Sequence, residues 1–297
     1  MTLAPIVLFV YNRPWHSQQT IEALQKNELS SESELFIYSD APKAEKDQEK
    51  VQEVRDYVHS IGGFKKLTII ERVENWGLAN SIVDGVTAIV NQYGKVIVLE
   101  DDLVTSPYFL KFMNNALNYY QNQQKVMHIS GWNYPINNNG FDDVFLWRLM
   151  NCWGWATWKD RWINYEKDVK KTISEFSKQD IEKLNLDGID DIWAQVIANK
   201  EKKISTWAIF WYVSIFKKNG LCLNPTQTFV ENIGNDGSGM HCGESDAYKS
   251  NLSELNTIQF INKLEENEFI VKEIKSFFLS QRKSIFDRII IKLKKVC

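Results

Sequence analysis

The sequence predicts an α/β protein with a Rossmann-like, mostly parallel central sheet flanked by helices. Through the first hundred residues, short apolar runs alternate with segments whose apolar residues recur at helical spacing, as in βαβ units. The apolar runs are rich in Val and Ile without polar alternation, which is typical of strands buried on both faces. With 297 residues, 44% of them hydrophobic and 25% charged, the chain can bury the core that such a sheet needs.

Four strands are expected in this first part, over residues 5–11, 34–39, 66–73 and 96–99. Helices are expected between them, over residues 15–26, 44–61 and 78–93. Gly94 directly follows the third helix, in the position where glycine commonly ends a helix. No Gly-x-Gly-x-x-Gly follows the first strand and no Gly-x-x-x-x-Gly-Lys-Ser/Thr occurs. Both absences count against a dinucleotide-binding enzyme and a P-loop nucleotidase.

The second part of the chain is less regular. We expect a helix over 107–120, strands over 126–130 and 144–148, a Trp-rich turn and helix over 153–165, polar helices to about residue 200, an apolar helix over 205–218, short strands within 221–231, and a glycine-rich loop over 232–245. No linker and no internal repeat divides these segments, so we expect one continuous domain over 1–250, followed by a helical tail over 251–297.

The most informative stretch is the apolar run Val96–Leu99, which ends in Glu100, Asp101 and Asp102. Three adjacent carboxylates repel one another, and burial would increase that cost. A divalent cation such as Mg²⁺ or Mn²⁺ would relieve the repulsion, because these ions prefer oxygen ligands. The carboxyl end of a central strand is also where open α/β sheets bind ligands. We therefore expect a metal site that holds a diphosphate; a solvated acidic turn is the alternative.

Trp and Cys residues add weaker signals. Several of the eleven Trp gather in residues 147–162 and 193–211, where they can form either core or a sugar-binding surface. The four Cys show no metal-type spacing, so we expect reduced thiols in a cytoplasmic protein. No apolar stretch approaches the roughly 20 residues needed to cross a bilayer.

The C-terminal tail is strongly basic. Residues 271–297 carry eight Lys or Arg against Glu273 and Asp287, so this segment has a net charge of +6 and the remainder −9. Its cations alternate with Ile, Leu and Phe, a pattern typical of an amphipathic helix at an anionic membrane surface. The alternative is a helix packed on the body or in a dimer. Nucleic-acid binding is not expected, because the rest of the chain is acidic.

Five stretches in order resemble the GT-A glycosyltransferases, which use nucleotide sugars. They are residues 7–14 (VLFVYNRP), 38–40 (YSD), 74–79 (ENWGLA), 99–102 (LEDD) and 154–158 (GWATW). The last two are similar to bacterial surface-polysaccharide sugar transferases and to N-acetylglucosaminyltransferase I, and the loop 231–242 is closer to the bacterial group. The resemblance implies a GT-A fold with a nucleotide-binding half over about 1–105 and an acceptor-binding half over about 106–250.

The resemblance also implies roles for the acidic residues. Asp102 would ligate Mn²⁺ or Mg²⁺ on the diphosphate, and Glu100 or Asp101 would contact the ribose or the transferred sugar. His241, after a glycine-rich loop, would be a second metal ligand, since imidazole suits Mn²⁺. That loop would then act as a lid that excludes water.

The nucleotide pocket is expected at the ends of the first three strands. Tyr11 would stack on the base and Arg13 would bind a phosphate. Asp40 would accept a hydrogen bond from a uracil-like base or would simply cap a helix. Arg72, Asn75 and Gly77 would line the ribose or phosphate site at a helix start, with N-capping as the alternative.

The acceptor side and the catalytic base follow less directly. Trp153, Gly154 and Trp155 would form a face for the sugars, or else belong to the core. Inversion at the anomeric carbon needs a carboxylate near the acceptor hydroxyl. The position where related sequences carry this acid is Ala208, so Asp190 and Asp191 are the first candidates and Asp236 the third. Without a base, a retaining mechanism would be credible.

The sequence thus predicts a metal-dependent glycosyltransferase that moves a sugar from a nucleoside diphosphate donor, a UDP-sugar first, to a hydroxyl of a glycan or polyprenyl-linked acceptor. Capsule or O-antigen assembly on the inner face of the membrane is the expected setting. Two alternatives are a sugar-nucleotide nucleotidyltransferase, which would want a basic glycine-rich loop after the first strand, and a non-catalytic glycan-binding protein of the same fold.

Overall fold

A computed structural model describes residues 2–237 and 246–294, with side chains described up to residue 282. The strands are β1 (Ile6–Val10), β2 (Glu34–Ser39), β3 (Lys66–Glu71), β4 (Lys95–Glu100), β5 (Leu103–Thr105), β6 (Val126–Ser130), β7 (Val144–Trp147), β8 (Trp155–Trp158), β9 (Leu221–Pro225) and β10 (Val230–Asn232). The helices are α1 (Pro14–Gln25), α2 (Gln48–Ser60), α3 (Leu78–Tyr93), α4 (Phe109–Tyr119), α5 (Lys159–Trp162), α6 (Val169–Glu175), α7 (Lys178–Leu184), α8 (Ala194–Lys200), α9 (Ala208–Lys217) and α10 (Glu268–Lys294). Two short 3₁₀ helices, Ser30–Glu32 and Glu45–Asp47, precede β2 and α2.

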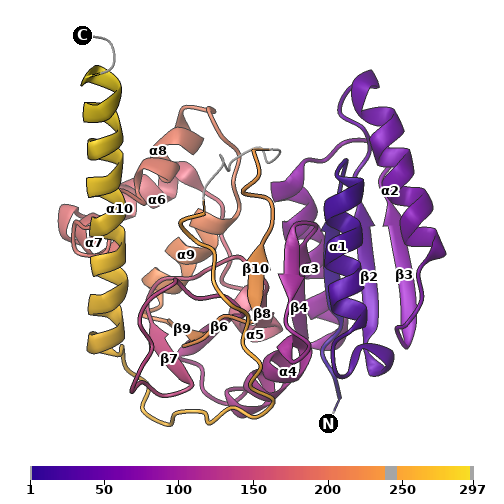
Figure 1. Cartoon of the computed structure of the whole chain (residues 1–297), viewed down its shortest axis with the longest axis horizontal. Helices are drawn as coiled ribbons and strands as arrows, with labels where there is room; N and C mark the ends of the chain where they lie inside the picture. The colour runs from indigo at the N-terminus through magenta and orange to yellow at the C-terminus, as the bar shows by residue number, and fades with distance from the viewer. Residues whose placement is uncertain (1, 238–245, 295–297) are drawn as a thin grey trace.

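An eight-stranded sheet in the order β3-β2-β1-β4-β8-β6-β9-β7 forms the centre of the molecule (Figure 1). Strands β3, β2, β1 and β4 are parallel, and β9 is parallel to β6. Strand β8 pairs antiparallel with both β4 and β6, and β7 pairs antiparallel with β9. Helix α3 packs against β1, β4 and α5, whereas α1 packs against α2 and β5. The predicted mixed α/β architecture, with a mostly parallel sheet flanked by helices, is confirmed.

Strand β8 corrects one sequence-based expectation. Residues 153–165 were expected to form a turn and a helix, but Trp155–Trp158 is a strand and only Lys159–Trp162 is helical. All four residues of β8 are buried, and the strand has a neighbour on each side. Aromatic and β-branched residues suit such a position, and here the pairing partners, which are distant in sequence, decide the conformation.

Strand β4 confirms the expectation of a strand buried on both faces. Val96, Ile97, Val98 and Leu99 have no exposed surface. The parallel register places Phe9 of β1 opposite Glu100, so the carboxyl ends of β1 and β4 meet at one edge of the sheet. The loops that follow β1, β2, β3 and β4 therefore leave the sheet at the same edge.

Of the tail expected to be helical over 251–297, Glu268–Lys294 forms helix α10, whereas residues 251–267 contain no helix. The first turns of α10 pack on the body. Ile270 and Ile274 have no exposed surface, and Val271 is 8% exposed. The helix stands along the side of the molecule opposite β3 (Figure 1). No helix in the described ranges is long and apolar enough to cross a membrane.

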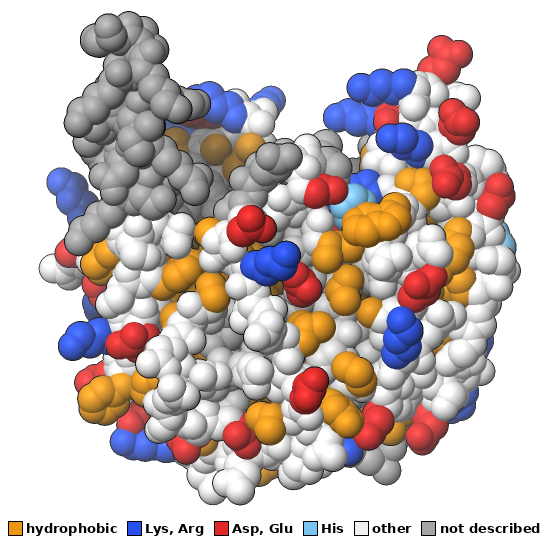
Figure 2. Space-filling model, in the orientation of Figure 1, with side chains coloured by type: hydrophobic (Ala, Val, Ile, Leu, Met, Phe, Trp, Pro, Cys, Tyr) orange, Lys and Arg blue, Asp and Glu red, His pale blue; other side chains and the backbone are white. Residues whose placement is uncertain are grey.

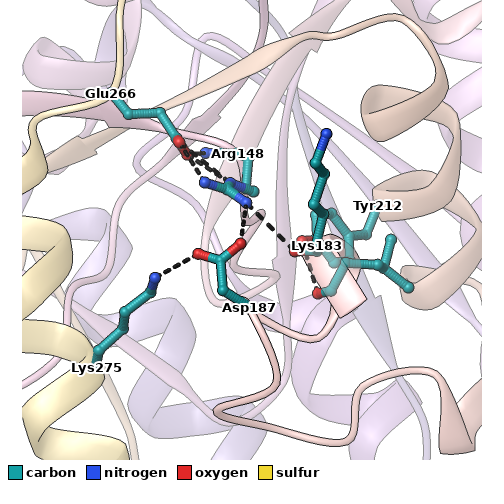
Figure 3. Close-up of polar contacts among 7 residues, drawn as sticks. Arg148, Lys183, Asp187, Tyr212, Glu266 and Lys275 are labelled. Carbon is teal, nitrogen blue, oxygen red and sulfur yellow. Dashed lines mark hydrogen bonds and ion pairs between the residues drawn. The ribbon is translucent and has the colours of Figure 1, made fainter. Parts of the chain in front are cut away.

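Ion pairs attach α10 and the segment before it to the body (Figure 3). The Arg148 guanidinium donates to Glu266, with Nη2 2.6 Å and Nε 2.8 Å from the carboxylate, and the backbone N–H of Arg148 donates to the same carboxylate at 2.9 Å. Arg148 also pairs with Asp187 at 3.1 Å, and Asp187 pairs with Lys275 of α10. Asp187 lies in a left-handed turn, with φ +58°, which points its carboxylate between both cations.

Replacing Glu266 should weaken the attachment of α10 to the body of the protein. We expect Glu266→Ala to lower the free energy of unfolding by about 1–2 kcal/mol, because Arg148 then loses three hydrogen bonds at a partly buried site. Urea unfolding measures the loss, and hydrogen exchange should show faster exchange in α10. Glu265→Ala is the matched control, because the partner of Glu265 within the described part of the chain is the exposed Lys263. Equal stabilities of the two variants would contradict this assignment.

Candidate functional site

The candidate site lies at the carboxyl edge of the parallel strands. It combines the turn that follows β4, the loop that follows β1 and a segment from late in the chain. The late segment is brought there by β10, which pairs antiparallel with β5 so that Asn232 lies opposite Leu103. The surface is hollowed at this upper edge of the molecule (Figure 2). Three segments separated by up to 220 residues thus meet around one acidic turn.

Arg13 is the cation that faces this acidic turn. Its guanidinium pairs with Asp101 through Nη2, and Nη2 also lies 2.9 Å from Oδ2 of Asp102. A longer contact joins Nε to the other oxygen of Asp101, at 3.4 Å. The side chains of Asp101 and Asp102 are only 7% and 13% exposed, and that of Arg13 is 20% exposed. One guanidinium therefore bridges two of the three adjacent carboxylates.

Among the residues that the structure describes, no cation forms an ion pair with the remaining acid, Glu100. Burial, together with repulsion from Asp102 and Asp101, raises the pKa of Glu100 to about 8, although Arg13 acts in the opposite direction. Burial also raises the pKa of Asp101 against the effect of Arg13. For Arg13 itself, burial disfavours the charged form, but the two carboxylates outweigh it and raise the pKa. Glu100 is therefore protonated in much of the population near neutral pH.

The late loop closes on Asp102 from the other side. The backbone N–H of Ile233 donates to the carbonyl of Asp102 at 2.9 Å. Gly234 packs so tightly that a Cβ there would lie 2.3 Å from Oδ2 of Asp102 and 3.1 Å from Nη1 of Arg13. Only glycine fits this contact without a shift of the acidic turn or the loop. His241, the second expected metal ligand, lies outside the described residues.

The three candidate bases lie in two different places. Asp236 lies near the acidic turn, where its carboxylate is 3.1 Å from Nε2 of the buried His16 on the first turn of α1. Asp190 and Asp191 lie between α7 and α8. Asp190 faces α10, with its carboxylate 3.9 Å from Arg282, and accepts the backbone N–H of Asp191. Of the three carboxylates, that of Asp236 contacts a described side chain of the site, His16.

Asp40 holds two loops of the site together. Its carboxylate accepts the backbone N–H groups of Trp76 at 2.9 Å, Gly77 at 2.8 Å and Ala41 at 3.0 Å. Asn75 reinforces the junction by donating to the carbonyl of Ala41 at 2.7 Å. Trp76 and Gly77 both precede α3, so in this structure Asp40 fixes the loop that leads into the helix.

Arg72 is paired within the protein. Its guanidinium forms an ion pair with Asp84 of α3 and lies 3.8 Å from the ring centre of Trp76. The ring of Tyr38 lies on the same guanidinium at 5.3 Å. Trp76 keeps 41% of its surface exposed, so the strand-to-helix loop presents an aromatic ring fixed by a cation.

Tyr11 also has internal partners. Its hydroxyl donates to Asp47 at 3.1 Å and accepts the backbone N–H of Lys43 at 2.9 Å. Asn12 donates to the same Asp47 at 3.0 Å. These bonds hold the 3₁₀ turn before α2 against the exit of β1, and the phenol ring remains partly exposed at the site.

The Trp-rich segment contributes mainly packing. Trp155 has no exposed surface and stacks between Trp207 and His128, at centroid distances of 5.0 and 5.4 Å. Gly154, with φ +62°, lies under β10, where a Cβ would be 2.8 Å from Val230. Trp153 is partly exposed and contacts Trp132 at 4.6 Å. Of the three residues, Trp153 alone offers ring surface to a ligand in this conformation.

Sequence reasoning missed His16 and the ring of Trp76 as parts of this edge. His16 follows Arg13 by three residues, a spacing that places both at the start of one helix, and this was the available signal. The buried His128 is not a further candidate. Its Nδ1 accepts from Trp211 at 3.2 Å, its Nε2 faces the Asn151 carbonyl at 3.0 Å, and burial lowers its pKa to about 3.

Comparison with known proteins gives structural likenesses only. No protein-family model matches the chain, and no curated protein matches it. Among solved structures, residues 1–349 of TarS from S. aureus match with a TM-score of 0.44 and 10% identity over 79% of this chain and 61% of that chain. The mannosyltransferase PcManGT from Pyrobaculum calidifontis, in complex with GDP-Man and Mn²⁺, matches with a TM-score of 0.41 and 10% identity over 73% of this chain and 68% of that chain. A longer TarS structure matches with a TM-score of 0.32 and 15% identity over 46% of this chain, and this chain covers 22% of its length.

The acidic turn fits a divalent cation in part. Asp102 supplies a hard carboxylate at a sheet edge, which suits Mg²⁺ or Mn²⁺. Among residues 2–237 and 246–294, however, no group of three His, Cys, Asp or Glu side chains is arranged to hold a metal. A metal at Asp102 would therefore need its further ligands from outside these described side chains, such as water or a bound diphosphate.

The raised pKa of Glu100 predicts a pH-dependent stability. The folded protein holds this proton up to about pH 8, whereas an unfolded Glu loses it near pH 4.5, so stability falls as the pH rises toward 8. His128 acts in the opposite direction only below about pH 6.5. We expect the free energy of unfolding to fall by about 1–2 kcal/mol between pH 6.5 and 8, and Glu100→Gln to flatten that slope. Denaturant unfolding at a series of pH values measures the free energy of unfolding. The same dependence on pH in the unaltered protein and in Glu100→Gln would contradict the prediction.

Proposed function

We propose that this chain is a GT-A type glycosyltransferase that transfers a sugar from a nucleoside diphosphate donor to a hydroxyl acceptor. One observation carries the proposal most directly. A strand buried on both faces delivers three adjacent carboxylates to the ligand-binding edge of a parallel sheet, beside an arginine and under a glycine-containing loop. The ordered motifs of the sequence support the same reading.

In this proposal the metal, when bound, acts as a Lewis acid that neutralises charge on the departing nucleoside diphosphate. Asp102 holds the metal, and Glu100 and Asp101 form its acidic surroundings and face the ribose or the sugar. Arg13 binds the diphosphate, since a guanidinium matches phosphate oxygens with two parallel hydrogen bonds. His241 remains a proposed second metal ligand.

The base and ribose would lie between the exit of β1 and the loop before α3. Asp40 fixes this loop by accepting the backbone N–H groups of Trp76 and Gly77, and Asn75 donates to the carbonyl of Ala41. Tyr11 and Arg72 would lie at the border of the pocket. A UDP-sugar is our first candidate donor. The partly exposed Trp153 is our candidate for contact with the sugar or the acceptor, while Gly154 and Trp155 support it from the core.

We propose Asp236 as the catalytic base of an inverting transfer, ahead of Asp190 and Asp191. Its carboxylate lies on the loop that covers Asp102, beside the buried His16. A base on that loop would reach the acceptor only when the loop lies over the donor, which couples proton removal to exclusion of water.

The proposed acceptor is a glycan or polyprenyl-linked sugar in surface-polysaccharide assembly at the inner face of the membrane. The basic segment 271–297 supports peripheral contact with anionic lipid, because its cations up to Lys294 lie on α10, whose first turns pack on the body. Exposed Phe269 and Leu279 extend the apolar surface of that helix.

Asp102→Asn tests the metal assignment. It should lower Mn²⁺-dependent release of nucleoside diphosphate from the donor at least 100-fold, because the amide no longer supplies a charged ligand. Turnover assays over a panel of UDP- and GDP-sugars measure this, and thermal unfolding should show an intact fold. Asp56→Asn, an exposed change in α2, is the control. Undiminished Mn²⁺-dependent turnover in the Asp102 variant would overturn the assignment.

Asp236→Asn tests the base. We expect kcat to fall by about 10²–10⁴-fold while donor binding stays within about threefold, because proton removal is lost and the diphosphate contacts remain. Asp190→Asn and Asp191→Asn should retain most activity. A larger loss in either of these two would move the base to the segment between α7 and α8.

A further inference from the structure

The acidic turn already contains a cation, and that cation belongs to the chain. Arg13 contacts both Asp101 and Asp102 through the same Nη2 atom, and its Nε reaches Asp101 as well. Thr20 fixes the turn by donating to the Asp101 carbonyl at 2.8 Å and accepting the N–H of Leu103 at 3.1 Å. The guanidinium thus does in the free protein what a metal would otherwise do: it neutralises adjacent carboxylates.

The same contact obstructs a metal ion. The Oδ2 atom of Asp102 is 2.9 Å from Arg13, and Gly234 packs so close that a Cβ there would lie 2.3 Å from the same oxygen. A divalent ion at this oxygen would lie beside a guanidinium that cannot lose its charge. Because like charges repel strongly at a poorly solvated site, the free ion must displace Arg13 before it can bind.

A diphosphate changes this balance. Its oxygens can accept both N–H groups of the guanidinium, which gives Arg13 a partner at least as good as Asp102. The released Asp102 carboxylate is then available to the ion, and the diphosphate supplies further ligands that the described side chains do not. Ion and diphosphate therefore help one another to bind, which is a coupling between two ligands.

We propose that Arg13 makes the site specific for the metal complex of a nucleoside diphosphate and against the free ion. This inference rests on the proposed function, because it assigns the diphosphate to that site. Arg13 acts by exchange: in the free protein it pairs with Asp101 and Asp102, and in the complex it pairs with phosphate while Asp102 takes the ion. The site then does not fill with cellular divalent ions in the absence of a donor.

Mn²⁺ binding to the full chain tests the exchange, with isothermal calorimetry and the electron paramagnetic resonance signal of free Mn²⁺ as readouts. Without nucleotide, Arg13→Gln should bind Mn²⁺ at least tenfold more tightly than the unaltered protein. Adding Asp102→Asn to that variant should remove the gain. Arg55→Gln is the matched control, since Arg55 is a similarly buried arginine, 16% exposed, paired with Glu71 at 3.3 Å; its Mn²⁺ affinity should not change.

The second arm adds UDP or GDP. In the unaltered protein the nucleotide should raise the Mn²⁺ affinity at least tenfold, and in Arg13→Gln this enhancement should be smaller, because only the ligands that the diphosphate itself supplies then contribute to it. Arg13→Lys keeps the charge and should exclude free Mn²⁺ as the unaltered protein does. If Arg13→Gln does not fold, two measurements still test the exchange. They are the rise in Mn²⁺ affinity on adding nucleotide to the unaltered protein, and the Mn²⁺ affinity of Arg13→Lys without nucleotide.

The outcomes separate the two claims. Nucleotide binding with a Mn²⁺ affinity that is the same with and without Arg13 would overturn the inference and leave the proposed function standing. Failure of UDP, GDP and their Mn²⁺ complexes to bind at all would overturn the proposed function. Tight binding of Mn²⁺ to the unaltered protein alone would also overturn the inference, because Arg13 would then not exclude it.

Discussion

The compensation of charge at the end of β4 is the constraint on which the site depends. Two carboxylates about 4 Å apart repel each other by about 4 kcal/mol at an effective dielectric constant of 20, and here three follow one another at the edge of a buried strand. The fold meets this cost in two ways. Arg13 bridges Asp101 and Asp102, and Glu100 takes up a proton more readily than an exposed glutamate. Both responses leave the acids able to change partner when a ligand arrives.

The sheet topology places Arg13 and the Gly234 loop next to the three carboxylates. Parallel pairing of β1 with β4 delivers the Arg13 loop next to the acidic turn, and antiparallel pairing of β10 with β5 delivers Gly234. Strand β8, between β4 and β6, completes the support from the other half of the sheet. Trp155 of β8 is fully buried in the core beneath the carboxyl edge of the sheet. The Trp-rich motif therefore supports the candidate site by packing, and Trp155 presents no surface to a ligand.

Local patterns in the sequence were enough to predict the strands β1 to β4, the helices between them and the acidic strand end. Each of these depends on a period or a run that neighbouring residues share. Strand β8 was mispredicted, because its conformation depends on pairing with β4 and β6. The partners of Arg13, 88 and 89 residues away, could not be read from spacing. For the same reason, spacing could not show that Asp40 accepts from Gly77 in the loop before α3 or that Arg72 pairs with Asp84 of that helix.

The segment between β10 and Ser253 is anchored at both ends. Asn232 pairs with Leu103, and Ser253 is buried, donates its N–H to Thr228 at 2.7 Å and receives the hydroxyl of Ser106 on its carbonyl at 2.6 Å. The two anchors lie on the same few residues around β5 and β10, so the chain between them begins and ends at nearly one place. The entropy of closing such a segment changes only slowly with its length. Changes in the length of this segment that keep Gly234 against Asp102 and Asp236 beside His16 would therefore leave the sheet beneath it intact.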